Sequence, residues 1–182
     1  MIGTVILAAG AGTRFGGAIK QLHDHEGRPM LEVVLDTIAS SGMALPVVVL
    51  GANAQHVRDG IDLHGARAVV CQDWQDGQAA SLRCGLAALP QDAEAALVVL
   101  ADGPSLDPRA VSRIAAADPG DPPQAVAADY GAGRSHPVLI PRALWAALPA
   151  TGETPGRSLP TRLVDCRDIT APGDVDYPQS RQ

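Results

Sequence analysis

A length of 182 residues, with 46% hydrophobic and only 3% aromatic residues, is typical of a globular protein whose interior is filled by aliphatic side chains. The net charge of −6 argues against nucleic-acid binding, which calls for a basic surface and aromatic groups that stack on bases. The apolar runs have the length of strands, so no membrane-spanning helix is expected.

The cysteines and the N-terminus bear on the compartment. Cys71, Cys84 and Cys166 are odd in number and lack Cys-x-x-Cys spacing, which speaks against structural zinc and against a disulfide framework. The chain begins with a strand pattern at residues 4–8 and has no basic segment typical of a signal peptide. A cytoplasmic protein is therefore expected.

Apolar runs and amphipathic segments alternate along the first two thirds of the chain. The runs do not alternate polar and apolar residues, as expected of parallel strands covered on both faces. The predicted strands are residues 4–8, 46–50, 68–71 and 95–101. The predicted helices are residues 30–41, 53–60, 79–89 and 108–117, with Asn53 and Asp107 as N-caps of the second and fourth.

The last third has a looser pattern. Residues 118–123 are predicted as a loop, 125–129 and 136–140 as strands, 141–148 as a short helix, and 149–161 as a loop over the site. The alternation of strands and helices predicts an α/β fold, a three-layer Rossmann-like sandwich with a mostly parallel central sheet. No linker or repeat is apparent, so residues 1–182 are expected to form a single domain.

A glycine-rich segment, residues 9–17, directly follows the first predicted strand. Successive backbone N–H groups in such a turn form a concavity for anions, and glycine lets the backbone approach closely. Arg14 offers a guanidinium fork for phosphate oxygens, and Lys20 adds a point charge. These features predict a phosphate-binding loop; the alternative is a flexible glycine-rich turn.

Two familiar phosphate-binding motifs do not fit this segment. The dinucleotide fingerprint Gly-x-Gly-x-x-Gly would need its third glycine one residue before Gly16. The P-loop needs Lys-Ser/Thr after its last glycine, whereas Gly17 is followed by Ala18 and Ile19.

Motifs in order along nearly the whole chain resemble the molybdenum-cofactor nucleotidyltransferases, which have the nucleotide-diphosphosugar transferase fold. The cytidylyltransferase branch is the most similar. The matching segments are Leu7-Ala8-Ala9-Gly10, Arg14, Gly16, Lys20-Gln21-Leu22, Gly27-Arg28-Pro29-Met30, residues 77–86, Asp102-Gly103-Pro104, His136-Pro137 and residues 174–178. The late loop departs from the family pattern at residues 152–156, and Tyr177 replaces a threonine.

The resemblance implies roles for particular residues. Arg14, Lys20 and Asp102 would be catalytic, Asp102 and Asp176 would hold Mg²⁺, and His136 would contact the acceptor. The implied nucleotide-binding residues are Leu7, Ala8, Ala9, Gly10, Gly12, Thr13, Arg14, Lys20, Gly77 and Ser81.

Several of these positions have simpler interpretations. Asp102 follows an apolar strand and could be a turn residue, and Ser81 could cap its helix. His136 could be an ordinary hydrogen-bonded histidine. Asp174 is an alternative to Asp176 as second acid, and both could lie in a solvated acidic loop. His23 and His25 are interpreted as solvated loop residues, because no further metal ligands lie at a suitable spacing.

The expected reaction is the transfer of a nucleoside monophosphate to a phosphorylated acceptor with release of pyrophosphate. Leu-Ala-Ala-Gly is typical of the cytidine branch, which implies CTP as donor, molybdopterin as acceptor and a molybdoenzyme or maturation factor as possible partner. The alternatives are guanylyl transfer, or nucleotidyl transfer to another sugar or polyol phosphate. A non-catalytic nucleotide-binding module is the alternative from another class.

Overall fold

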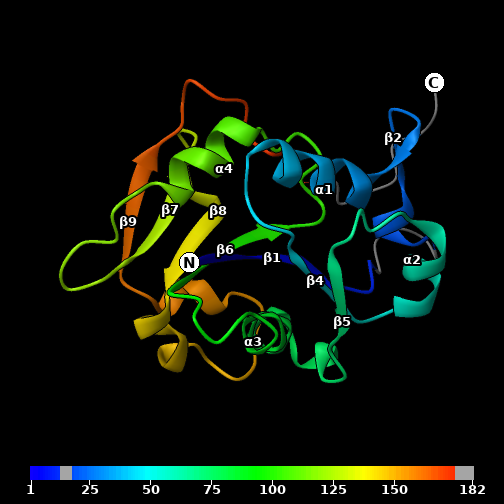
Figure 1. Ribbon diagram of the computed structural model, residues 1–182, viewed down its shortest axis with the longest axis horizontal. Coiled ribbons are helices and arrows are strands. Elements are labelled where there is room, and N and C mark those ends of the chain that lie inside the picture. The colour runs from blue at the N-terminus through cyan, green and yellow to red at the C-terminus, as the bar shows by residue number, and fades with distance from the viewer. Residues whose placement is uncertain (13–17, 175–182) are drawn as a thin grey trace.

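A seven-stranded sheet forms the middle of the computed structural model, which describes residues 1–12 and 18–174 (Figure 1). Its strands are β1 (Ile2–Ala8), β4 (Val47–Leu50), β5 (Arg67–Val70), β6 (Ala95–Leu100), β7 (Ala125–Asp129), β8 (Arg134–Pro141) and β9 (Thr161–Asp165). They lie in the order β5-β4-β1-β6-β8-β7-β9. Strand β8 is antiparallel to both of its neighbours, whereas the other pairs are parallel. The predicted mostly parallel sheet is confirmed.

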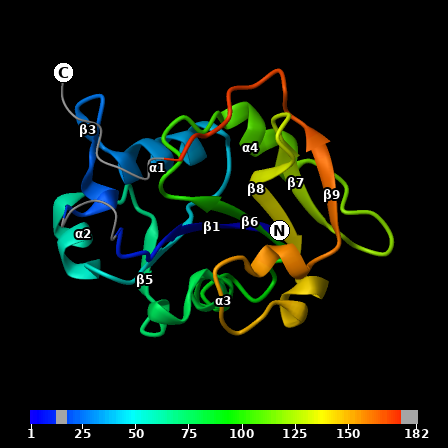
Figure 2. The same ribbon diagram turned by 180° about the vertical axis from the view of Figure 1, so that it is seen from behind.

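Helices cover both faces of this sheet (Figures 1 and 2). Helices α1 (Met30–Ser40), α2 (Ala54–Gly60) and α4 (Pro108–Ala115) contribute to the apolar core on one face, and α3 (Gln78–Ala87) to the core on the other. The remaining elements are the hairpin of β2 (Asp24–His25) and β3 (Arg28–Pro29) and the 3-10 turns η2 (Lys20–Leu22), η3 (Trp74–Asp76), η4 (Arg142–Ala147) and η5 (Pro155–Ser158). Within the described ranges, no helix combines the length and apolar character needed to cross a bilayer.

Strand β1 shows how an unbroken apolar run supplies side chains to the cores on both faces of the sheet. Its side chains alternate between faces, so that Ile6 and Ala8 pack in one core while Val5 and Leu7 pack in the other. All four are at most 8% exposed. The sequence and the structure therefore agree on three layers, helix, sheet and helix, with aliphatic side chains between them.

Three local predictions need correction. Asn53 precedes α2 but adopts a left-handed conformation (φ 60°), and its side chain makes no capping hydrogen bond. The segment predicted as a short helix at 141–148 is the 3-10 turn η4. Strand β9 was not predicted; it pairs with β7 at the edge of the sheet.

The N-cap predicted for the fourth helix is confirmed. The Asp107 carboxylate accepts a hydrogen bond of 2.8 Å from the backbone N–H of Arg109, and Pro108 occupies the first helical position.

Gly85 permits the close approach of α3 to the sheet. A Cβ atom at this position would lie 2.5 Å from Cγ1 of Val5 and 2.8 Å from Cγ2 of Val49. Gly85→Ala should gain helix propensity of about 1 kcal/mol, but overpacking against two stiff β-branched side chains should cost about 1–3 kcal/mol. We expect a net loss in the free energy of unfolding, measured by urea denaturation.

Gly60→Ala at the end of α2 is the matched control for Gly85→Ala. A Cβ atom there meets only the far end of the Leu22 side chain, at 3.0 Å. This side chain can move aside, so stability should be unchanged or higher. Equal effects of the two substitutions would contradict the packing explanation.

Candidate active site

The candidate site lies where the strand order reverses. From β1 the chain continues to β4 and β5 on one side, whereas β6 lies on the other side of β1. Such a switch point at the carboxyl edge of parallel strands is where α/β sheets bind ligands. The glycine-rich loop leaves β1 at this edge, and Asp102 follows β6 beside it.

A pocket of about 360 Å³ lies between the glycine-rich loop and the start of α3. Its lining residues are Leu7, Ala9, Gly10, Ala11, Gly12, Trp74, Gln75, Gly77, Gln78, Ser81, Leu100, Asp102 and Glu153. Seven residues predicted for the site are thus brought together here: Leu7, Ala9, Gly10, Gly12, Gly77, Ser81 and Asp102. Nothing in the sequence pattern singles out Trp74 and Gln75, which lie in η3.

A smaller pocket of about 140 Å³ adjoins the first and shares Asp102 with it. Ala8 and Lys20, the remaining described residues of the predicted nucleotide site, line this second pocket. Thr13 and Arg14, which were also predicted, lie outside the described residues.

Lys20 is the only lysine of the chain. Its Nζ atom donates a hydrogen bond of 2.8 Å to Oδ2 of Asp102 and lies 3.4 Å from Oδ1 of Asp174. Burial of the amine acts to lower its pKa, but the hydrogen bond to Asp102 and the negative charges of both aspartates outweigh burial, so the pKa lies above the ordinary value. Lys20 therefore keeps its positive charge at neutral pH.

The second carboxylate oxygen of Asp102 has no partner among the described residues. Oδ1 is buried and makes no hydrogen bond, although Oδ2 is bound by Lys20. A buried carboxylate oxygen without a partner is costly, and a divalent cation would satisfy it. Within the described ranges no group of three or more histidine, cysteine or acidic side chains is placed to hold a metal, so phosphate and water would have to complete such a site. Asp176, the predicted second ligand, lies outside these ranges.

The late loop lies over the start of α3, as predicted. The Gly152 carbonyl accepts a hydrogen bond of 2.9 Å from the N–H of Ala79, and the Gly152 N–H donates to the Asp76 carbonyl at 2.8 Å. Gly77 has a φ of 99°, and a Cβ atom there would lie 2.7 Å from the Gly152 oxygen. Only glycine combines this backbone conformation with so close an approach.

Ser81 is not a helix cap. It lies inside α3 and is buried, whereas Gly77 occupies the N-cap position. The structure therefore removes the capping alternative and leaves Ser81 in the lining of the larger pocket.

His136 lies on β8 in a third pocket, of about 190 Å³, together with Asp102 and Asp174. Because β8 runs antiparallel to β6, its beginning lies at the carboxyl edge of the parallel strands. Burial lowers the pKa of His136 to about 4 despite the opposing charge of Asp102. The ring is therefore neutral at physiological pH and can offer one donor and one acceptor.

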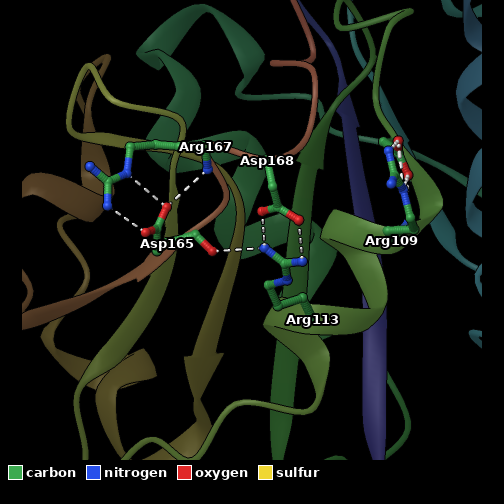
Figure 3. A network of polar contacts seen from close by, with 6 residues as sticks. Arg109, Arg113, Asp165, Arg167 and Asp168 are labelled. Atoms are coloured by element: carbon green, nitrogen blue, oxygen red, sulfur yellow. Dashed lines mark hydrogen bonds and ion pairs between the residues drawn. The ribbon is translucent and has the colours of Figure 1, made fainter.

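An ion pair joins the chain after β9 to α4. Arg113 on α4 forms two hydrogen bonds with the Asp168 carboxylate, at 2.6 and 2.9 Å, and donates to the Asp165 carbonyl at 2.9 Å (Figure 3). Further along, the Pro172 carbonyl accepts a hydrogen bond of 3.0 Å from the N–H of Ser105, close behind Asp102. These contacts return residues 166–174 to the sheet edge where Lys20 lies.

The seven-stranded, mostly parallel sheet belongs to the nucleotide-diphosphosugar transferase fold. The chain belongs to the MobA-like NTP transferase domain family, whose sequence profile matches residues 4–166. The resemblance found in the sequence is thus confirmed at the level of the family.

Two relatives are similar over most of their length. Nicotine blue oxidoreductase of Paenarthrobacter nicotinovorans is 34% identical over 94% of this chain and 90% of that protein. The crystal structure of Rv0371c from Mycobacterium tuberculosis H37Rv is 29% identical, with a TM-score of 0.80, and covers 97% of this chain and 93% of that one. A second structure of Rv0371c contains manganese; it is 27% identical, with a TM-score of 0.75, over 90% and 87% of the two chains.

Other curated relatives are much longer than this chain. The bifunctional protein GlmU of Mycobacterium sp. strain KMS is 42% identical over 57% of this chain, and the match spans only 22% of that protein.

Proposed function

We propose that this protein transfers a nucleoside monophosphate, CMP from CTP, to a phosphorylated acceptor of the molybdopterin type with release of pyrophosphate. The observation that carries the proposal is the position of Asp102. Its unpartnered buried oxygen and its ion pair with Lys20 lie beside the glycine-rich loop at the switch point of the sheet. An anion-binding loop, a cation and a carboxylate free to take a metal are the parts that phosphoryl chemistry needs.

The reaction needs positioning and charge neutralisation rather than an enzyme nucleophile. An acceptor phosphate oxygen forms a bond to the α-phosphorus, and the bond from that phosphorus to the bridging oxygen breaks, so that pyrophosphate leaves. Lys20, and Arg14 by family resemblance, would neutralise the negative charge of the phosphates. The end of β1 and the start of the loop, residues 7–12, together with Thr13, Gly77 and Ser81, would hold the nucleotide in line with the acceptor.

The metal proposed for the site is Mg²⁺. When bound, it would polarise the phosphate and compensate its charge. Asp102 would supply one oxygen ligand, and Asp176 a second by resemblance to the family's closing motif. Asp174 would support this arrangement from its position beside Lys20, and the neutral His136 ring would face the acceptor.

Turnover is the direct test of the proposal. Pyrophosphate release is measured with each of the four nucleoside triphosphates, Mg²⁺ and a panel of acceptors: molybdopterin, sugar phosphates and polyol phosphates. If the protein binds a triphosphate tightly but releases no pyrophosphate under any condition, the alternative of a non-catalytic nucleotide-binding module is favoured. Because one relative is named nicotine blue oxidoreductase, redox turnover of nicotine blue is assayed in parallel, and turnover only in that assay would overturn the proposal.

CTP is expected to be preferred over GTP. Ala8 and Ala9 are at most 5% exposed and lie at the start of the loop, with Ala9 in the wall of the larger pocket. Their Cβ atoms narrow the space for a purine compared with glycine. The ratio of kcat/KM for CTP to that for GTP should be at least about 10, the scale on which a filled pocket discriminates between bases.

The Ala9→Gly variant is the control for nucleotide choice. It should reduce the ratio of kcat/KM for CTP to that for GTP. A preference of the unmodified protein for GTP would instead favour the guanylyltransferase alternative.

A further inference from the structure

Gln21 is one of three buried polar residues in the described part of the chain, with a side chain only 5% exposed. It lies in η2, next to Lys20, and its Nε2 atom donates hydrogen bonds to the carbonyl oxygens of Ala8 at 2.7 Å and Gly10 at 3.1 Å. Both hydrogens of the amide are thus used to bind the backbone where β1 becomes the glycine-rich loop.

These two hydrogen bonds fix the orientation of two peptide groups, those that contain the Ala8 and Gly10 carbonyls. The bond between Gly10 and Ala11 is not among the cis peptides of the described residues, which both precede proline. In a trans peptide the N–H points opposite to the C=O. With the Gly10 oxygen held toward Gln21, the Ala11 N–H must point away from Gln21.

Gly10 and Gly12 line both pockets, but Gln21 and Ala11 each line only one of them. Gln21 lines the smaller pocket with Lys20, whereas Ala11 lines the larger pocket and not the smaller one. A hydrogen-bond donor on Ala11 that points away from Gln21 is therefore directed to the side of the larger pocket. An N–H group at this place suits an anionic oxygen.

We propose that Gln21 is a positioning residue, which holds residues 8–11 so that the Ala11 N–H faces an oxygen of the β- or γ-phosphate of the nucleoside triphosphate. The inference rests on the proposed function and extends it to a residue that acts through the backbone of the loop. Its physical basis is pre-organisation, because a loop containing Gly10 and Gly12 would otherwise lose conformational entropy on binding. Lys20, in the same turn, contributes the positive charge, whereas Gln21 holds the backbone in the orientation that binding requires.

The first test replaces Gln21 by methionine, which has similar length and no donor. Binding of CTP and of CMP is measured by calorimetry in the presence of Mg²⁺. The Kd for CTP should rise about tenfold, the effect of one lost hydrogen bond to a charged group. The Kd for CMP should rise much less, because CMP lacks the β- and γ-phosphates. A general collapse of the pocket would instead weaken both ligands equally, and this outcome would overturn the positioning role.

Gln55→Met is the matched control. Gln55 is an exposed residue of α2 whose amide contacts Asp59 at 2.9 Å, and it lies outside the pockets of the site. This variant should bind both nucleotides like the unmodified protein.

The second test needs no substitution and therefore does not depend on how a variant folds. In the ¹⁵N-labelled protein, the Ala11 amide signal is followed by NMR during titration with CTP and, separately, with CMP. CTP should shift this signal downfield more than CMP does. An Ala11 signal that stays in place while CTP binds would overturn the inference. Failure of the unmodified protein to bind any triphosphate would instead count against the proposed function.

Discussion

Asp102→Asn is expected to lower kcat/KM for nucleotidyl transfer by on the order of 100-fold or more, which exceeds the typical effect of altering a group that merely supports a metal ligand. The substitution keeps the shape of the side chain but removes its charge. It also places either an amide nitrogen or a weaker oxygen donor at the position where the buried Oδ1 has no partner. The concentration of Mg²⁺ needed for half-maximal activity should rise, and this is measured by titration at saturating CTP.

Asp92→Asn makes the same chemical change on an exposed residue that precedes β6. It should leave both activity and metal dependence unchanged. Thermal unfolding of both variants shows whether the fold is retained. Near-normal turnover of a folded Asp102→Asn protein would remove Asp102 from the mechanism.

Lys20→Met should lower kcat/KM by about 10- to 100-fold, the range for losing a hydrogen bond to a charged group. The amine that neutralises phosphate charge is lost, but so is the cation between Asp102 and Asp174. Two carboxylates without that cation attract a metal more strongly, so the Mg²⁺ concentration for half-maximal activity should fall or stay constant. This response is opposite in direction to that of Asp102→Asn and separates the two roles.

The control for Lys20→Met is Arg58→Met, which removes one positive charge from an exposed position on α2. It should leave transfer and its metal dependence unaltered. Because the pKa of Lys20 is raised, the amine does not titrate between pH 6 and 9. The pH profiles of kcat/KM for the unmodified protein and for Lys20→Met should therefore have the same shape in this range. If the Lys20→Met protein binds CTP and turns over normally, the phosphate-binding role is wrong and the glycine-rich segment is only a turn.

The parts of this fold that were predictable are those with a strong burial signal. Strands β1 and β6 are buried on both faces, so their unbroken apolar runs identify them, and Asp102 stands out because a charge ends such a run. Strand β9 has no such signal. Leu163 is 44% exposed at the sheet edge, and Pro160 precedes the strand, so the local pattern is that of a loop.

The candidate site shows the same division. The glycine-rich loop and Asp102 are each recognisable locally, whereas the approach of Asp174 to Lys20 joins residues 154 positions apart. Between these residues the chain after β9 is joined to α4 by the ion pair of Arg113 with Asp168, and the sequence pattern singles out neither partner. Gln21 belongs to a matching motif, but its bonds to the carbonyls of Ala8 and Gly10 depend on the fold of the turn. Asn53 shows that residue preference alone does not decide a cap when the chain takes a left-handed turn there.

The reversed direction of β8 has a consequence for how such proteins diverge. The proposed nucleotide side of the site is built from turns that follow parallel strands, and both the glycine-rich loop and Asp102 line its pocket. The other side of the site contains His136 on β8. Residues 130–133 form the hairpin turn that connects β7 to β8, and His136 follows this turn closely. Insertions or deletions in that hairpin would alter the proposed acceptor side without changing the residues that line the larger pocket. The hairpin is therefore the place to begin when engineering a new acceptor preference, because loops can change while the scaffold that holds them stays the same.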